Sequence, residues 1–286
     1  MEIPVITRRR RAHVKTAIGA SILAVVVLCA VLAPVLSPRD PLRQSLRDSL
    51  RPPLAREDGR PTYMLGSDNL GRDVLSRLLS GSRVSVTVGL VTVTVAAIIG
   101  CVLGALAGFY GGYVDYVLSK VAEMFLALPF LLLGIAVMAF MGSSLLNLVL
   151  VLVVRQWVQY FRVVRAEVMA LREREFVTAA RAIGARPSRI MFRHILPNCM
   201  ASIIVIGTFA MATVILSEAS LSFLGLGVPP SIPTWGSMLS EGRSYIYRAW
   251  WLTVFPGLAI FATVLGINLL GDGLRDRWDP KLKNES

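Results

Sequence analysis

Few residues in this chain have the types and spacing that catalysis or metal binding requires. The two histidines, His13 and His194, lie far apart in the sequence, and Cys29, Cys101 and Cys199 each stand alone in apolar surroundings. Zinc and iron–sulfur sites instead place Cys and His ligands a few residues apart. We therefore predict no catalytic residue and no bound metal, and expect each cysteine to be a small buried hydrophobic residue.

The four lysines exclude a phosphate-binding P-loop, because none of them follows the pattern G-x-x-x-x-G. If the protein works with ATP and Mg²⁺, another chain must bind them, and we predict no cofactor on this one. The formal net charge of +12 comes from arginines gathered at the ends of apolar runs. That placement is typical of residues that set membrane topology, and we predict no nucleic-acid partner.

The composition indicates that the partner is a lipid bilayer. Of the 286 residues 55% are hydrophobic and only 17% are charged, with a mean hydropathy of +0.63. Soluble domains contain about 25% charged residues. A spanning helix needs about 20 mostly apolar residues, and the predicted spans are 17–36, 84–108, 116–141, 145–164, 200–224 and 249–270. The expected fold class is an all-α membrane protein with six transmembrane helices.

Six spans place both termini on one side, and the basic N-terminus makes that side cytoplasmic. Under this topology 18 of the 30 Lys and Arg residues are cytoplasmic. Because the first run is long and further spans follow, we expect an uncleaved helix rather than a secretory signal. The chain then divides into a basic N-terminus (1–16), a first helix (17–37), an external segment (38–83), a five-helix core (84–275) with a cytoplasmic loop at about 165–199, and a cytoplasmic tail (276–286).

Two local patterns predict how these elements pack. Gly100, Gly104 and Gly108 recur at four-residue spacing, which forms a groove where another helix backbone can approach closely in lipid. Chance spacing in a glycine-rich chain is the alternative. Within 68–79, apolar positions share one face and charged positions the other, which favours an amphipathic helix in the outer interface. A solvated connector is the alternative there.

The stretch 175–198, EFVTAARAIGARPSRIMFRHILPN, predicts two short helices joined by a bend. Helix-forming residues run as far as Ile183, and Gly184 and Pro187 then interrupt them. A second short helix is expected over 190–196. The result is a compact protrusion on the cytoplasmic side.

This stretch resembles the motif of ABC-importer permeases, in which E-A-A is followed by three residues, Gly, nine residues and I-x-L-P. The matching positions are Thr178, Ala179, Ala180, Gly184, His194, Ile195, Leu196 and Pro197. The chain departs from the motif at Thr178, which replaces the glutamate and removes one possible salt bridge, and at His194, which replaces the first isoleucine.

Further segments are similar to the second permease subunit of dipeptide, oligopeptide and nickel importers, so that the resemblance covers roughly residues 17–283. They are LGSD (65–68), GRDVLSR (71–77), LSFLGLG (221–227), WG (235–236), NLLGDGLRD (268–276) and DP (279–280). The resemblance implies a type I ABC-importer fold, a bacterial inner-membrane location and a non-catalytic transport role. Di- or oligopeptides are the implied substrates, with nickel chelates, glutathione and opines as alternatives.

The resemblance also implies how such a subunit is driven. Two ABC ATPase subunits, which may be identical, carry ATP and Mg²⁺, and a second homologous permease and an extracytoplasmic solute-binding protein complete the importer. The loop then docks into a cleft of the ATPase through Thr178, Ala179, Ala180, Gly184, Ala185, Arg186, His194, Leu196 and Pro197. Gly184 lets the backbone turn and approach closely, and Ala179 and Ala180 offer a small-residue face, with plain helix propensity as the alternative. The loop arginines either pair with acids on the ATPase or are ordinary cytoplasmic charge.

Two ionisable residues, Arg155 and Glu218, fall within predicted spans. A charge at the bilayer centre costs about 2.5–3.5 kcal/mol on insertion scales, so neither should face lipid. They form a structural ion pair, or line the substrate path, with Glu218 toward a peptide ammonium and Arg155 toward a carboxylate, or contact the partner permease.

Two other functional classes fit less well. An intramembrane hydrolase at Gly142-Ser143 needs a base beside its nucleophile, and both histidines lie outside the predicted spans. An ATP-independent secondary transporter usually has paired broken helices, and the cytoplasmic loop argues against it.

Overall fold

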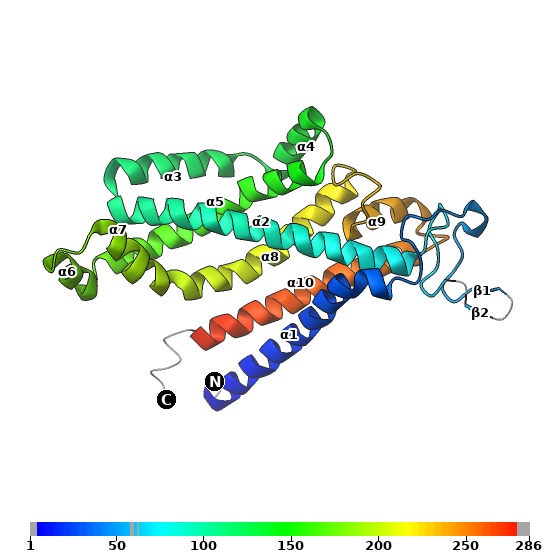
Figure 1. Cartoon of the computed structure of the whole chain (residues 1–286), viewed down its shortest axis with the longest axis horizontal. Helices are drawn as coiled ribbons and strands as arrows, with labels where there is room; N and C mark the ends of the chain where they lie inside the picture. Colours follow the sequence, from blue (N-terminus) through cyan, green and yellow to red (C-terminus); the bar gives the residue numbers. More distant parts are fainter. Residues whose placement is uncertain (1–4, 58–59, 62, 279–286) are drawn as a thin grey trace.

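The computed structural model describes residues 5–57, 60–61 and 63–278, and it is almost entirely helical. Most of the long helices run roughly along one direction (Figure 1). The α-helices are α1 (Val5–Leu36), α2 (Val74–Tyr110), α3 (Gly112–Ala127), α4 (Phe130–Met141), α5 (Leu145–Arg172), α6 (Glu175–Ala182), α7 (Pro187–Arg189), α8 (Met200–Phe223), α9 (Trp235–Gly242) and α10 (Trp251–Trp278). The remaining elements are a small hairpin of β1 (Arg56–Glu57) and β2 (Arg60–Pro61), 3₁₀ turns at Leu46–Asp48, Leu196–Cys199 and Arg243–Tyr245, and a π-helical turn at Ile190–Ile195.

Five segments of the described chain are long and apolar enough to cross a membrane, and the pair α3–α4 makes a sixth if it is one bent span. The two helices of that pair meet at 83°. Our prediction of one uninterrupted helix over 116–141 is therefore wrong. The break falls at Leu128 and Pro129, because proline has no N–H for the helical ladder and disfavours helical backbone in the residue before it.

The three spaced glycines lie on the face of α2 that packs against α5. A Cβ atom on Gly100, Gly104 or Gly108 would lie 2.4–2.6 Å from a backbone oxygen of α5, which is too close for any side chain. The two backbones therefore approach closely along just over two helical turns. Buried residues of α2, α5 and α8 form the largest hydrophobic core around this contact.

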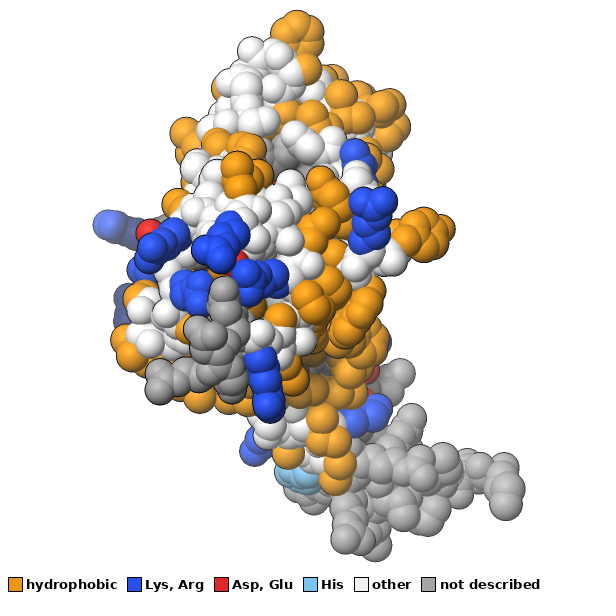
Figure 2. Space-filling view, turned by 90° about the vertical axis from the view of Figure 1, so that its right-hand side faces the viewer, with side chains coloured by type: hydrophobic (Ala, Val, Ile, Leu, Met, Phe, Trp, Pro, Cys, Tyr) orange, Lys and Arg blue, Asp and Glu red, His pale blue; other side chains and the backbone are white. Residues whose placement is uncertain are grey.

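One end of the molecule, hereafter the α6 end, carries α6 and α7 together with the start of α1 and the end of α10, which pack side by side (Figure 1). The opposite end carries the irregular segment 37–73 and α9. Seen from that end, Lys and Arg side chains gather on the surface and hydrophobic side chains cover much of the flanks (Figure 2). The predicted tail beyond residue 278 and residues 1–4 of the predicted N-terminus lie outside the described residues.

The predicted interfacial helix over 68–79 is not a separate element. Its second half forms the first turns of α2, where Val74, Ser76 and Arg77 are almost completely buried. The Asp73 side chain caps this helix by accepting a hydrogen bond from the backbone N–H of Ser76 at 2.8 Å. The apolar face that we assigned to the membrane instead packs under the irregular segment and α9.

Candidate functional site

The protrusion at the α6 end is a short amphipathic helix anchored to the helical core. Val177 and Ala180, three residues apart, are buried and belong to the largest hydrophobic core. Ala185 packs partly against the same core. Ala180 therefore faces inward, whereas we expected it to share an outward face with Ala179. Thr178 and Ala179 are exposed.

Gly184 ends α6 in a Schellman turn. The backbone N–H of Ala185 donates to the Ala180 carbonyl at 3.1 Å, and that of Gly184 donates to the Arg181 carbonyl at 2.9 Å. Gly184 has a φ of +76°, a conformation that residues with a Cβ rarely adopt. Among the described residues, no atom lies within 4 Å of a Cβ built at this position. Backbone conformation alone, rather than space within the chain, therefore requires glycine here.

The outward surface of the protrusion carries exposed apolar side chains and exposed arginines. Ile183 is 85% exposed at its tip, and Phe176 and Phe192 are about half exposed. The exposed arginines around them are Arg181, Arg186, Arg189 and Arg193. Exposed apolar side chains that form a patch are typical of a surface that a partner covers.

The second half of the predicted motif belongs to the entry into α8. His194 and Leu196 are half-buried in the π-helical and 3₁₀ turns that precede it, and Pro197 is exposed. The Asn198 side chain donates to the backbone carbonyl of His194 at 2.6 Å. These residues therefore join the protrusion to the long helix α8.

Arg155 and Glu218 have different surroundings, and no ion pair joins them within the described chain. Arg155 is exposed on α5, donates through Nη1 to Ser217 Oγ at 2.9 Å and lies 4.5 Å from the ring centre of Phe130. Glu218 is 1% exposed. Its carboxylate accepts hydrogen bonds from the hydroxyls of Ser222 at 2.8 Å and Ser85 at 3.3 Å. Glu218 thereby joins α8 to α2, whereas Arg155 faces outward.

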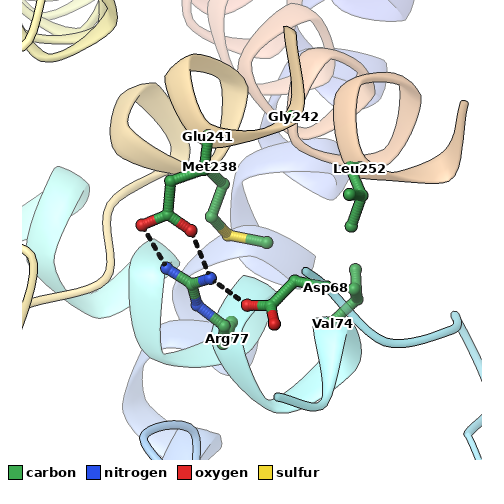
Figure 3. Close-up of a pocket in the computed structure, with 7 residues that line it drawn as sticks. All are labelled: Asp68, Val74, Arg77, Met238, Glu241, Gly242 and Leu252. Carbon is green, nitrogen blue, oxygen red and sulfur yellow. Dashed lines mark hydrogen bonds and ion pairs between the residues drawn. The ribbon is translucent and has the colours of Figure 1, made fainter. Parts of the chain in front are cut away.

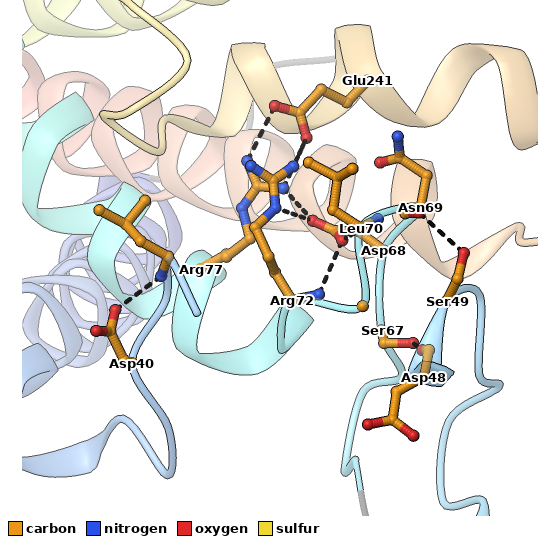
Figure 4. A network of polar contacts seen from close by, with 12 residues as sticks. Asp40, Asp48, Ser49, Ser67, Asp68, Asn69, Leu70, Arg72, Arg77 and Glu241 are labelled. Atoms are coloured by element: carbon orange, nitrogen blue, oxygen red, sulfur yellow. Dashed lines mark hydrogen bonds and ion pairs between the residues drawn. The ribbon is translucent and has the colours of Figure 1, made fainter. Parts of the chain in front are cut away.

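Sequence reasoning missed a buried ion cluster at the opposite end, formed by Asp68, Arg72, Arg77 and Glu241 (Figures 3 and 4). Arg72 donates to Asp68 and to Glu241, both at 2.6 Å. Arg77 donates to the same two carboxylates. We hereafter call these four residues the Arg77 cluster. It joins the segment before α2, the first turns of α2 and α9.

No set of three or more His, Cys, Asp or Glu side chains that could hold a metal occurs among the residues that the structure describes. What the geometry offers instead is an exposed protrusion, a long helical bundle and an exposed arginine on a helix that is long and apolar enough to cross a membrane. Such features suit a membrane protein that works through partners.

Comparisons with known proteins identify the family. Residues 100–284 match the family model described as "Binding-protein-dependent transport system inner membrane component". The chain is 48% identical to the di/tripeptide transport system permease protein DppC of Pseudomonas aeruginosa, over 82% of this chain and 77% of that protein. It is 45% identical to the glutathione transport system permease protein GsiD of Pectobacterium atrosepticum, over 78% and 74%.

The fold is similar to a solved transporter. A chain of the methionine ABC transporter MetNI in an inward-facing conformation superposes with a TM-score of 0.56 at 20% sequence identity, over 68% of this chain and 93% of that one. The fold, the family model and the relatives agree with the resemblance drawn from the sequence. The chain therefore belongs to the binding-protein-dependent transport system inner membrane component family, as a non-catalytic permease subunit of the peptide-importer type.

Proposed function

We propose that this permease subunit imports di- or oligopeptides as part of an ATP-driven importer. It forms half of the translocation path, a second homologous permease forms the other half, and two ATPase subunits bind ATP and Mg²⁺. An extracytoplasmic solute-binding protein delivers the peptide. The similarity to di/tripeptide and dipeptide permeases over about four fifths of the chain supports the substrate class.

The proposed topology has six spans, with the bent pair α3–α4 counted as one, and both termini in the cytoplasm. The start of α1, the end of α10 and α6 lie at one end of the molecule (Figure 1), which supports this orientation. Single cysteines provide the test. Ile183→Cys should react with a membrane-impermeant thiol reagent only from the cytoplasmic side, and Tyr247→Cys, at a fully exposed position, only from outside.

The observation that carries the coupling role is the exposure of Ile183 at the tip of a protrusion fixed to α5 and α8. We assign the surface formed by Phe176, Ile183 and the neighbouring arginines to a groove on the ATPase subunit. ATP binding would close the ATPase dimer and draw the two protrusions together. The two permease halves would then move between inward- and outward-open states, because the free energy of ATP binding shifts the equilibrium between these two states.

The experiment places a charge at the tip of the protrusion in the complete importer. Ile183→Glu should abolish co-purification with the ATPase subunits and ATP-dependent uptake, because it buries an unpaired carboxylate in the interface. Tyr247→Glu makes the same kind of change at an exposed position far from α6 and should leave co-purification intact. Normal assembly of the Ile183→Glu importer would contradict the coupling role.

Glutathione is the second candidate substrate, favoured by the GsiD relative at 45% identity. Uptake competition in the reconstituted importer separates the candidates. Unlabelled di- and tripeptides should reduce uptake of a labelled dipeptide, whereas competition by glutathione alone would reassign the substrate. Uptake that continues without the ATPase subunits would favour the ATP-independent transporter instead.

A further inference from the structure

The outward face of α5 carries a stripe of polar side chains inside the membrane-spanning region. Arg155, Gln159 and Arg162 are all exposed and occur at i, i+4 and i+7, which places them on one face of the helix. We call them the donor stripe. At 1.5 Å rise per residue it extends over about 10 Å. The rest of α5 is mostly buried against α2 and neighbouring helices.

The stripe presents hydrogen-bond donors. Within the described chain the Arg155 guanidinium makes one hydrogen bond, to Ser217, and one ring contact, with Phe130, so most of its five N–H groups stay available. The Gln159 side-chain oxygen already accepts a hydrogen bond from the buried Gln156 amide. This leaves the Gln159 NH₂ group as the outward-facing end of that side chain.

The charge of the stripe is not neutralised within the described chain. Neither Arg155 nor Arg162 forms an ion pair there. Glu123 of α3 interacts electrostatically with Arg162, but it is itself paired with Lys120 at 2.7 Å. The Arg155 guanidinium lies near the middle of the predicted span 145–164 and cannot face lipid without a large free-energy cost, whereas Arg162 lies near the cytoplasmic end of that span, where a long side chain can reach the interface. The stripe must therefore face water, a solute or another subunit.

We propose that the donor stripe lines the solute path and binds the terminal carboxylate and the carbonyl oxygens of a peptide. Guanidinium groups bind carboxylates through paired charge-assisted hydrogen bonds. A length of about 10 Å matches roughly three residues of extended chain. The inference rests on the proposed function. It specifies which part of the solute this subunit recognises: the negatively charged carboxylate and the carbonyl acceptors, rather than the positively charged amino group.

The test probes water access and the sign of the local charge without depending on the solute-binding protein. Gln159→Cys is introduced after Cys29, Cys101 and Cys199 are replaced by alanine, and the complete importer is reconstituted. Anionic methanethiosulfonate ethylsulfonate should react faster than the cationic ethyltrimethylammonium reagent, after correction for their rates with a free thiol. A unit positive charge about 7 Å away in water predicts a ratio of about sevenfold.

Combining this cysteine with Arg155→Gln and Arg162→Gln should bring the ratio near one. The matched control is Arg248→Gln, an exposed arginine at the opposite end, which should leave the ratio unchanged. A thiol that reacts with neither reagent, with or without ATP, would show that the partner permease covers the stripe. Equal reaction with both reagents would show that the stripe does not select anions. Either outcome overturns the proposal.

Transport provides the second measurement. Arg155→Gln should lower dipeptide uptake about tenfold while the subunits still assemble, and Arg155→Lys should recover part of the uptake because it restores the charge. Equal uptake by Arg155→Gln and the unsubstituted protein would contradict the inference alone. Absence of ATP-dependent peptide uptake by the unsubstituted importer would instead contradict the proposed function.

Discussion

Arg77 on α2 holds the carboxylate of Glu241 on α9 through two hydrogen bonds, of 2.6 Å from Nη1 and 3.1 Å from Nη2 (Figure 3). The two residues are 164 positions apart in the sequence. Arg77 is 2% exposed and also donates to the buried Asp68. The contact therefore fixes α9, at the end of the molecule opposite α6, to the start of the helix that packs along α5.

Arg77→Ala should destabilise the protein by about 3 kcal/mol, because it leaves two carboxylates beside a single arginine in a buried site. The apparent melting temperature in detergent measures this effect. Arg248→Ala removes an exposed arginine from the same end and should change stability by no more than about 0.5 kcal/mol. Equal melting temperatures for the two variants would show that the Arg77 cluster contributes no net stability.

The close contact between α2 and α5 leads to a second prediction, which concerns the stability of glycine variants on α2. A Cβ atom on Gly104 would lie 2.6 Å from the Phe161 carbonyl oxygen and 3.1 Å from the Arg165 backbone nitrogen. Both of these atoms belong to the backbone of α5, which cannot move aside as a flexible side chain could. Gly104→Ala should therefore cost about 1–3 kcal/mol through overpacking. Gly207→Ala on α8 is the matched control, because its nearest neighbour would be the Tyr160 hydroxyl at 3.5 Å. The heat-stable fraction of each variant in detergent tests the difference.

Hydrophobic length and spaced glycines predicted the fold well because both patterns can be recognised within the sequence of one helix. The predicted span 200–224 and the observed α8, Met200–Phe223, agree almost exactly in their bounds. The predicted bend at Gly184 is also present, as a φ of +76°. These features depend on local backbone chemistry and on the thickness of the bilayer, which the sequence carries directly.

Features that depend on tertiary contacts were missed. The amphipathic pattern over 68–79 has the same form whether its apolar face meets lipid or protein, and only the contact with α9 decides between them. Nothing in the sequence around Glu241 indicates that its partner is Arg77, because the two residues are 164 positions apart. Pro129, in the middle of an uncharged run, was the available signal for the break between α3 and α4, and apolar length outweighed it in our prediction.

The segment before α2 should lose stability in acid through Asp48. Hydrogen bonds donated by Ser45 at 2.8 Å and Tyr63 at 3.1 Å, with the charges of Arg51 and Arg39, hold the pKa of Asp48 below its ordinary value. A carboxylate whose pKa is lower in the folded state stabilises the protein fully above its unfolded pKa of about 3.9. That stabilisation disappears as the pH falls through the folded pKa.

Asp48→Asn should therefore lower the melting temperature at pH 7 and lower it less at pH 3, because the unsubstituted protein loses this contribution as the Asp48 carboxylate becomes protonated. The control is Asp40→Asn, at an exposed carboxylate in the same segment, which should change the melting temperature much less at pH 7. A difference between Asp48→Asn and the unsubstituted protein that persists undiminished at pH 3 would contradict the role given to the Asp48 charge.

The turn at Gly184 separates backbone strain from steric contact, because a Cβ at this position would meet no atom of the residues that the structure describes. Gly184→Ala should cost about 1 kcal/mol or more through its φ of +76°, and Gly184→Asn should cost less, because asparagine tolerates this conformation better. If the backbone turn alone matters, peptide-stimulated ATP hydrolysis should fall in the order Gly, Asn, Ala. If the ATPase groove instead packs directly on the Gly184 Cα, the larger asparagine should be the more damaging substitution. Measuring ATP hydrolysis of the assembled importer with both variants distinguishes the two, because strain and partner contact predict opposite orders.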